Sequence, residues 1–550
     1  MNQEIYIVPE PEELTFSGKW FSFDGFENFP KFLSDEFRIK SGSWKLLKVS
    51  GEGIGVRVKE GVVEYWGNEK VAFATIIQLT LQREGYLPEV TIKENFRFSF
   101  RGFHLDIARG GVPKLETFKK ILRWLFLLKY NYFAIYLEDL FPWEKYPQIG
   151  ARRGRLTREE LSEIVEYGRK LGVKVFPSLE LTGHMEHILT LPEFKKYSEW
   201  HRPQEGCLDL SNEEARKFAY DLLQEVLDFF DSEFVHIGGD ETWALGRGKS
   251  LNKKWVFEGP WLYLEHHRKM INMVEKSGKK AMLWGDMLTG MYLSKDEAEK
   301  WSEVLNSDIW ERVIIANWDY SSRSKEFFKE KIRIFSKRGL KQVVCPGLSN
   351  WNRYYPDFDK ALENLKNFLG AAKEEGVFGF LVTAWGDDGE ECLFSLLYPL
   401  ILAAIEFAEG NGEWEDKWMK LTRESEDILK IRKLFGRSTI ANNIKKILFT
   451  PVEELGDVRE YFDEELVKEL CATEKVLLPK DLSFIREAIL TCLKKLEGNA
   501  TVSDFIRLAN LYSELWLDER KVPGLQKILN RFWGSASNID LSYRIRKIKK

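Results

Sequence analysis

The chain has 550 residues, of which 44% are hydrophobic, and its 82 basic and 86 acidic side chains give a formal net charge of -4. A chain of this length can form two or three domains with hydrophobic cores of ordinary size. Because charges of both signs are interspersed, there is no broad basic field, which argues against a nucleic-acid-binding protein.

Three features of the sequence bear on its cellular location. Residues 1–14 are acidic and lack the basic and apolar regions of a secretory signal, so we expect a cytoplasmic protein. The five cysteines are odd in number and far apart, which argues against a disulfide framework or a structural zinc site. The apolar run 392–408 is short for a membrane span and contains Pro399 and Glu406, so it predicts a buried helix and no membrane partner.

The N-terminal residues 1–97 are predicted to form a small α/β domain. The segments 55–58 and 62–65 have strand-like patterns, and a helical pattern follows over 70–81. No group of residues in this segment indicates chemistry.

Residues 98–410 are predicted to form a second, larger domain, because eight short apolar runs alternate there with helical patterns. Most of the runs are apolar on both faces, as strands of a parallel sheet must be. The predicted strands are 102–107, 132–137, 174–179, 234–237, 280–284, 313–318, 342–345 and 378–383. Eight such units predict a (β/α)8 TIM barrel.

Helix boundary signals support this assignment. Thr157 is a predicted N-cap and Gly172 a predicted stop for a helix over 157–171, and Ser211 is a predicted N-cap for a helix over 212–230.

Residues 411–550 show only helical periodicity, clearest in 421–435, 484–496 and 503–517. The expected fold is therefore an α/β chain: a TIM barrel with a small N-terminal α/β domain and a C-terminal all-helical domain.

Polar and aromatic side chains follow all eight predicted barrel strands, where the active sites of such barrels lie. They are Asp106, Arg109, Glu138, Asp139, Glu180, His184, Asp240, Glu241, Trp284, Asp286, Trp318, Tyr320, Trp351, Trp385 and Asp387.

The most informative segment is 234–243, in which Gly238 and Gly239 precede Asp240 and Glu241. Residues of a regular strand alternate faces, so two adjacent acids reach one pocket only where the strand frays, and the glycines supply that freedom. One acid can then hold a sugar while the other donates a proton. Helix capping by Asp240 is the ordinary alternative, but it leaves the two glycines unexplained.

Aromatic and histidine residues admit two interpretations. Tryptophans at the predicted barrel mouth can stack on sugar rings, although each alone can equally be a core residue. They are Trp243, Trp284, Trp318, Trp351 and Trp385. His184, His187 and His236 lack the spacing of common zinc motifs, so positioning of a carboxylate is favoured over metal binding.

At these residues the chain resembles glycoside hydrolase family 20, the β-N-acetylhexosaminidases. The hallmark of that family is a His-x-Gly-Gly-Asp-Glu segment after the fourth barrel strand, and it is intact here over 236–241. The similarity covers roughly residues 1–408 and includes the segments 101–109, 137–139, 183–184 and 383–387. Residues 238–250 and 345–352 are most similar to the branch of intracellular exo-β-N-acetylglucosaminidases and hexosaminidase D.

The resemblance implies an exo-acting, anomer-retaining β-N-acetylhexosaminidase that hydrolyses terminal β-linked GlcNAc, with GalNAc left open. Glu241 would be the general acid/base. The acetamido oxygen of the substrate would attack the anomeric carbon to form an oxazolinium ion, with Asp240 orienting the acetamido nitrogen. The family needs no metal and no organic cofactor, and a homodimer is expected because dimers occur in this branch.

The resemblance also suggests roles in substrate binding. Arg109 and Asp387 would bind sugar hydroxyls, with Asp388 as an alternative or addition, and Trp385 would floor the acetamido pocket. Tyr320 is preferred over Tyr354 and Tyr355 as the donor to the acetamido carbonyl. The predicted substrate-binding residues are Arg109, Asp139, His184, Trp284, Trp318, Tyr320, Trp351, Trp385 and Asp387.

Two other functions remain open at this point. A retaining β-glycosidase could use Asp240, or a carboxylate on another strand, as a covalent nucleophile toward sugars without an acetamido group. A catalytically inactive sugar-binding protein is the second, which the intact Asp240 and Glu241 argue against. The natural glycan and its linkage are not indicated by the sequence.

Overall fold

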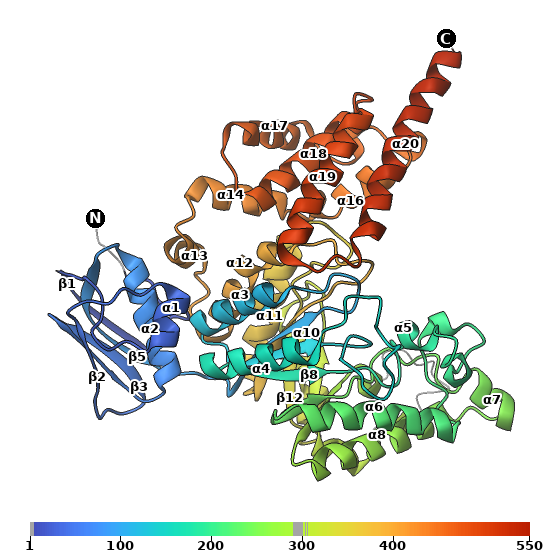
Figure 1. The fold of residues 1–550 in the computed structure, drawn as a ribbon, viewed down its shortest axis with the longest axis horizontal. Helices are drawn as coiled ribbons and strands as arrows, with labels where there is room; N and C mark the ends of the chain where they lie inside the picture. The colour runs from blue at the N-terminus through green and yellow to red at the C-terminus, as the bar shows by residue number, and fades with distance from the viewer. Residues whose placement is uncertain (1–4, 290–300, 303, 305, 550) are drawn as a thin grey trace.

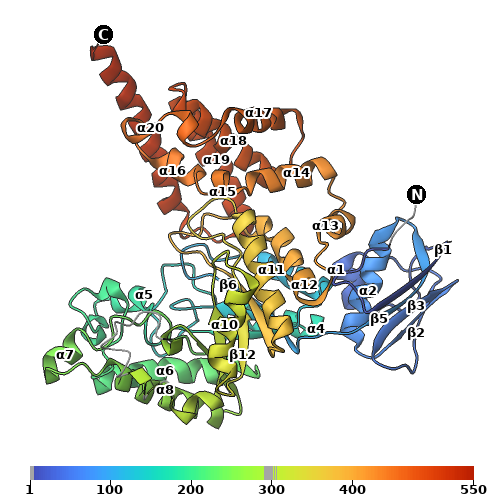
Figure 2. The ribbon, with the colours of Figure 1, turned by 180° about the vertical axis from the view of Figure 1, so that it is seen from behind.

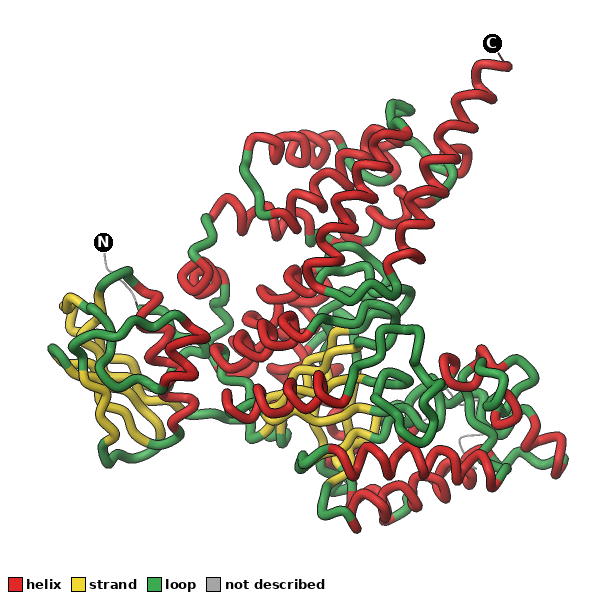
Figure 3. The backbone as a smooth tube through the Cα atoms, in the orientation of Figure 1, coloured by secondary structure: helices red, strands yellow, loops and turns green. Residues whose placement is uncertain are grey.

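The computed structural model describes residues 5–289, 301–302, 304 and 306–549. A strand-rich N-terminal region, a central barrel and a helical C-terminal region follow one another along the chain (Figure 1). The strands gather in two places, the N-terminal sheet and the barrel (Figure 3). The fold class predicted from the sequence is confirmed.

The N-terminal region is a five-stranded sheet with the strand order β1-β5-β3-β4-β2. Its elements are β1 (Glu13–Ser22), α1 (Lys31–Phe37), β2 (Lys45–Lys48), β3 (Ile54–Lys59), β4 (Val62–Trp66), α2 (Glu69–Gln82) and β5 (Tyr86–Glu94). The predicted strands in β3 and β4 and the helix α2 are confirmed. The sequence prediction missed β1, β2 and β5, because their charged residues obscure the apolar pattern.

The helix α2 lies between this sheet and the barrel. The Gln78 side-chain amide donates a hydrogen bond to the carbonyl oxygen of Leu127, 2.6 Å away, at the end of the barrel helix α3 (Leu115–Leu127).

Eight parallel strands close the barrel, which confirms the predicted strand count and positions. They are β6 (Phe100–Asp106), β7 (Tyr132–Tyr136), β8 (Lys174–Ser178), β9 (Phe234–His236), β10 (Lys280–Trp284), β11 (Ile314–Trp318), β12 (Gln342–Cys345) and β13 (Gly379–Ala384). Stacked rings fill the end of the barrel where the strands begin, for example Phe100 on Tyr132 with centroids 4.2 Å apart. Any site must therefore lie at the other end.

Helices surround the strands. They are α3, α4 (Arg158–Leu171), α6 (Glu213–Phe229), α8 (Gly259–Lys276), α10 (Lys325–Ser336), α11 (Phe358–Glu374) and α12 (Tyr398–Glu409). The run 392–408 forms the buried helix α12 and the short turn before it, as predicted. Within the described part of the chain, no helix combines the length and the apolar character that crossing a bilayer requires.

The capping predictions are partly correct. Thr157 begins α4 with a capping box, and Gly172 ends it at φ 82°. Asn212, and not Ser211, caps α6: its side chain accepts the Glu214 N–H at 3.0 Å. The Ser211 hydroxyl instead donates to Asp209 at 2.5 Å, so it is not available as a cap.

The C-terminal region consists of helices packed on the barrel, on a different side from the N-terminal sheet (Figure 2). They are α13 (Glu415–Thr422), α14 (Glu426–Phe435), α15 (Ser438–Ala441), α16 (Ile444–Phe449), α17 (Glu464–Ala472), α18 (Lys480–Leu496), α19 (Val502–Glu519) and α20 (Leu525–Lys549). This region holds the loop after β13: Lys527 and Arg531 form ion pairs with Asp388 at 3.0 and 2.6 Å.

Candidate active site

A pocket of about 200 Å³ opens at the end of the barrel where the strands finish. It is smaller than the roughly 300–1,000 Å³ of sites for drug-sized ligands, so it suits one small polar unit. The lining residues are Arg109, His184, Asp240, Glu241, Trp318, Tyr320, Trp351, Trp385 and Asp387. The ends of six barrel strands and the loops that follow them supply these residues.

The two glycines after β9 bring the adjacent acids to this pocket. Gly238 and Gly239 have φ values of 69° and 95°, and a Cβ on Gly238 would lie 2.1 Å from an oxygen of Glu180. Only glycine fits such a backbone at this distance. Glu241 follows at φ 47°, an uncommon conformation for a residue with a side chain and one that is concentrated at functional sites.

The two acids differ in exposure. The side chain of Asp240 is 11% exposed and that of Glu241 is 42% exposed. His184 Nε2 lies 3.6 Å from Asp240 Oδ2 and 3.4 Å from Glu241 Oε2. Asp240 is therefore a fixed internal group, whereas Glu241 is accessible to a group that leaves through the pocket opening.

His184 and Asp240 stabilise each other's charged forms. Burial opposes the protonated form of His184, but Asp240 and Glu241 outweigh it and raise the pKa of His184 well above its usual value. Burial also acts to raise the pKa of Asp240, but the His184 charge and a hydrogen bond from Glu180 lower it. Asp240 is thus ionised and His184 is protonated near neutral pH.

Two buried acids, Glu180 and Asp286, hold Asp240 and Glu241 in place. Burial and the Asp240 charge raise the pKa of Glu180 well above its usual range, so Glu180 is neutral and can donate to Asp240. Burial and the same charge raise the pKa of Asp286 to about 8. Asp286 accepts the Glu241 backbone N–H at 2.9 Å and the Trp318 indole N–H at 3.2 Å, which fixes the position of Glu241.

Arg109 and Asp387 form a second group of charged residues that line the pocket. The guanidinium group of Arg109 contacts Asp106 at 2.6 Å and Glu138 at 3.1 Å. Asp387 also lines the pocket, and burial raises its pKa to about 6, although the charge of Arg109 acts in the opposite direction. Arg109 and Asp387 therefore present a cation and a carboxylate to a ligand with hydroxyl groups.

Aromatic side chains form the remaining wall. The Trp385 indole N–H donates to the Tyr320 hydroxyl at 2.7 Å, which fixes the two rings against each other. Tyr320 is also stacked on Trp318, with ring centroids 5.1 Å apart, and lies 5.1 Å from Trp351. Tyr354 and Tyr355 are buried among aromatic residues of the C-terminal region and do not line the pocket.

The structure does not bring two predicted site residues to the pocket. Asp139 and its neighbour Glu138 point in different directions. Glu138 contacts Arg109, whereas Asp139 is paired with Arg153. Trp284 is fully buried, since it belongs to strand β10 and points into the barrel, where its indole N–H donates to Glu180 at 3.1 Å. Trp243, grouped with the barrel-mouth tryptophans, is 48% exposed and does not line the pocket.

Four further acids at the predicted strand ends, to which the sequence pattern assigns no individual role, also lie around the pocket. They are Asp106, Glu138, Glu180 and Asp286. Each is buried and contacts a residue that lines the pocket.

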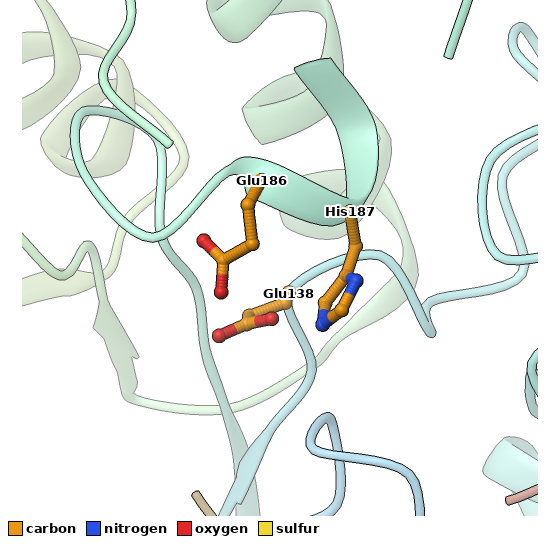
Figure 4. Close-up of side chains that lie close together, drawn as sticks. All are labelled: Glu138, Glu186 and His187. Atoms are coloured by element: carbon orange, nitrogen blue, oxygen red, sulfur yellow. The ribbon is translucent and has the colours of Figure 1, made fainter. Parts of the chain in front are cut away.

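His184, His187 and His236, which the sequence suggested as alternative metal ligands, do not form a common cluster. Among the described residues, the side chains close enough to bind one metal ion are Glu138, Glu186 and His187 (Figure 4). His236 lies in the barrel, where its Nδ1 accepts the Gly238 N–H at 3.1 Å.

Comparison with known proteins identifies related sequences and folds. A family model described as the glycosyl hydrolase family 20 catalytic domain matches residues 98–406. A β-hexosaminidase of Vibrio furnissii is 28% identical over 269 residues, covering 41% of this chain and 43% of that protein. Human hexosaminidase D is 24% identical over 345 residues, covering 58% and 67% of the two chains. The chain thus spans less than half the length of the Vibrio relative.

Solved structures show the same fold. The β-N-acetylhexosaminidase of Bacteroides fragilis aligns with a TM-score of 0.59 at 20% identity, covering 78% of this chain and 95% of that one. A chitobiase of Flavobacterium johnsoniae aligns with a TM-score of 0.59 at 16% identity, covering 100% and 94%. At these identities the likeness supports the fold alone.

Proposed function

This chain belongs to glycosyl hydrolase family 20, and from that premise we propose that it is an exo-acting, retaining β-N-acetylhexosaminidase that removes terminal β-linked GlcNAc. The observation that carries the proposal is the pair of adjacent acids in one small pocket, one buried and ionised and the other exposed. A single sugar unit fills such a pocket, which favours an exo-acting enzyme. Cytoplasmic location and homodimeric assembly stay predictions.

Glu241 acts on the leaving group. Its side chain is the more exposed of the two acids, and Asp286 holds its backbone. It donates a proton to the glycosidic oxygen as that bond breaks, and afterwards it accepts a proton from the attacking water. The C1–O bond breaks while the acetamido oxygen of the substrate bonds to C1, so no enzyme atom is joined to the sugar.

Asp240 acts on the acetamido group. The cyclic oxazolinium ion carries positive charge on the amide nitrogen, and the buried Asp240 carboxylate stabilises it through a short charge-assisted hydrogen bond. Trp385 and Tyr320 enclose the acetamido group. Burial raises the pKa of Tyr320 well above its usual value, so the phenol keeps the proton that it donates to the acetamido oxygen.

Loss of the Trp385 ring should weaken transition-state binding. Trp385→Ala removes an aromatic wall, and stacking and apolar burial of this size correspond to about 1–3 kcal/mol in kcat/KM. Trp243→Ala is the control, because Trp243 lies outside the pocket, and its kcat/KM toward an aryl glycoside should be unchanged. A Trp385→Ala enzyme with lower thermal stability but normal kinetics would make Trp385 a core residue only.

Substrate binding should depend on pH through Asp387. Its pKa of about 6 is raised, so the carboxylate that accepts sugar hydroxyls is charged above pH 6 and neutral below it. We expect kcat/KM to fall about tenfold per pH unit below that value, which gives the pH profile an acidic limb. Asp387→Asn should lower kcat/KM and remove this limb.

Asp388→Asn is the matched control for Asp387. The pKa of Asp388 is lowered: burial acts to raise it, but Lys527, Arg531 and Lys445 outweigh that effect. Its neighbours hold it outside the pocket, so the limb near pH 6 should remain. A limb that disappears in Asp388→Asn and persists in Asp387→Asn would reverse the assignment.

A panel of aryl β-glycosides tests the proposed function. Nitrophenyl β-GlcNAc should be hydrolysed with release of the β-anomer, and nitrophenyl β-GalNAc measures the tolerance for the C4 epimer. Nitrophenyl β-glucoside, which lacks the acetamido group, should be inert. Comparable turnover of the glucoside would reject the proposal, and tight binding of a GlcNAc-thiazoline without turnover of any substrate would indicate an inactive sugar-binding protein.

A further inference from the structure

Three side chains with metal-binding atoms converge beside the pocket. Glu138 follows strand β7, while Glu186 and His187 begin the short helix α5 (Glu186–Leu189) after β8. They point toward one another from these two segments (Figure 4). One ligand atom from each lies within 4.8 Å of the other two.

Only one of the two carboxyl oxygens of Glu138 has a protein partner. Its Oε1 accepts the Tyr136 hydroxyl at 2.9 Å and contacts Arg109 Nη2 at 3.1 Å. Its Oε2 is buried and has no hydrogen-bond partner, in a residue that is 3% exposed. A buried carboxyl oxygen without a partner is costly, so a positively charged or hydrogen-bonding ligand at this atom would stabilise the protein.

The acids around the cluster outnumber the cations. The interacting carboxyl groups are those of Asp106, Glu138, Asp139 and Glu186, and the interacting cations are Arg109, Arg153 and the protonated His184. Burial raises the pKa of Glu138 to about 8, so a bound dication would displace its proton.

We propose that Glu138, Glu186 and His187 bind one divalent metal ion of the zinc class, with water completing the coordination. One imidazole nitrogen and two carboxylate oxygens form a ligand set that suits Zn²⁺. In a tetrahedral site, ligand atoms about 2.1 Å from the ion lie about 3.4 Å apart, so a separation near 4.8 Å must close by roughly 1.4 Å. The partly exposed Glu186 side chain can make that adjustment.

An entry path to the site is present. His187 also lines a second hollow of about 320 Å³, together with Asp139 and Arg153. An ion can therefore approach His187 from this side without passing through the sugar pocket.

The ion would act by positioning. The ion would join the end of β7 to the start of α5. Helix α5 begins two residues after His184, and His184 contacts Asp240 and Glu241. This consequence rests on the proposed function, whereas metal binding itself does not. The binding experiment therefore needs no turnover, and its failure is distinguishable from failure of the proposed activity.

The test is a zinc titration of the full-length, EDTA-treated protein in competition with a chromophoric chelator. We expect one bound Zn²⁺ per chain, and both His187→Ala and Glu186→Gln should weaken this binding at least about tenfold. Glu241→Gln should leave it unchanged, which separates the site from the sugar pocket. His201→Ala and Glu213→Gln are matched controls, because both residues are exposed and lie outside the cluster and the second hollow.

Co²⁺ provides a second readout that does not depend on folding of the variants. The wild-type protein should develop visible d–d absorption bands on addition of one equivalent of Co²⁺, and Zn²⁺ should displace them. Absence of these bands, or zinc binding that is the same in wild type and folded His187→Ala, would overturn the proposal.

Discussion

Glu241→Gln should lower turnover by about two to four powers of ten on substrates with poor leaving groups, the usual scale for general acid catalysis. The amide keeps the shape of the side chain but has no acidic proton for the glycosidic oxygen. Glu241 is the exposed acid of the pocket, so it is the group that can reach this oxygen. Initial rates with alkyl or sugar leaving groups measure the effect.

Leaving groups that need no proton provide the internal control for Glu241. A dinitrophenyl glycoside departs as a stable anion, so its bond-breaking step should lose much less rate in Glu241→Gln. Equal losses for both classes of substrate, or no loss for either, would assign the proton transfer to another residue.

Asp240→Asn should lower turnover sharply, by roughly two to three powers of ten, the scale found when one preorganised electrostatic contact to a transition state is removed. The substitution keeps the shape and removes the negative charge that stabilises the oxazolinium ion. Burial is the main cause that keeps the neighbouring Glu180 neutral, so Glu180 does not replace the lost charge. The measurement is kcat with an aryl β-GlcNAc, alongside a thermal melt to show that the variant is folded.

Azide distinguishes the two roles that Asp240 could have. If Asp240 were a covalent nucleophile, azide would rescue Asp240→Asn and yield a glycosyl azide with an inverted anomer. If Asp240 only assists the substrate's own amide, no such inverted product should form. A clear rescue with this product would assign Asp240 to the rival mechanism.

The barrel could be predicted from the sequence because parallel strands buried on both faces have a simple apolar signature. The strand ends then indicated the site, and the backbone at Gly238 and Gly239 agrees with the argument that adjacent acids require glycines before them. The assignments within the pocket rested on the family resemblance as well as on this pattern.

The predicted and observed pocket linings differ where the direction of a side chain, and not its position along the chain, decides whether it faces the pocket. Trp284 and Trp385 both lie near strand ends, but Trp284 points into the barrel and Trp385 lines the pocket. Glu138 and Asp139 are neighbours, yet Arg109 contacts the first and Arg153 holds the second. Only the packing of distant segments determines these directions, so the sequence pattern could not resolve them.

The most direct test of the substrate-assisted mechanism is an intact-mass measurement on the wild-type protein. The protein is incubated with an activated 2-deoxy-2-fluoro glycoside, which lacks the acetamido group and would trap a covalent nucleophile. GlcNAc-thiazoline, a stable analogue of the oxazolinium ion, is tested in parallel as an inhibitor. The account predicts an unmodified mass and strong inhibition by the thiazoline, whereas a fluorosugar adduct mapped to Asp240 would contradict it.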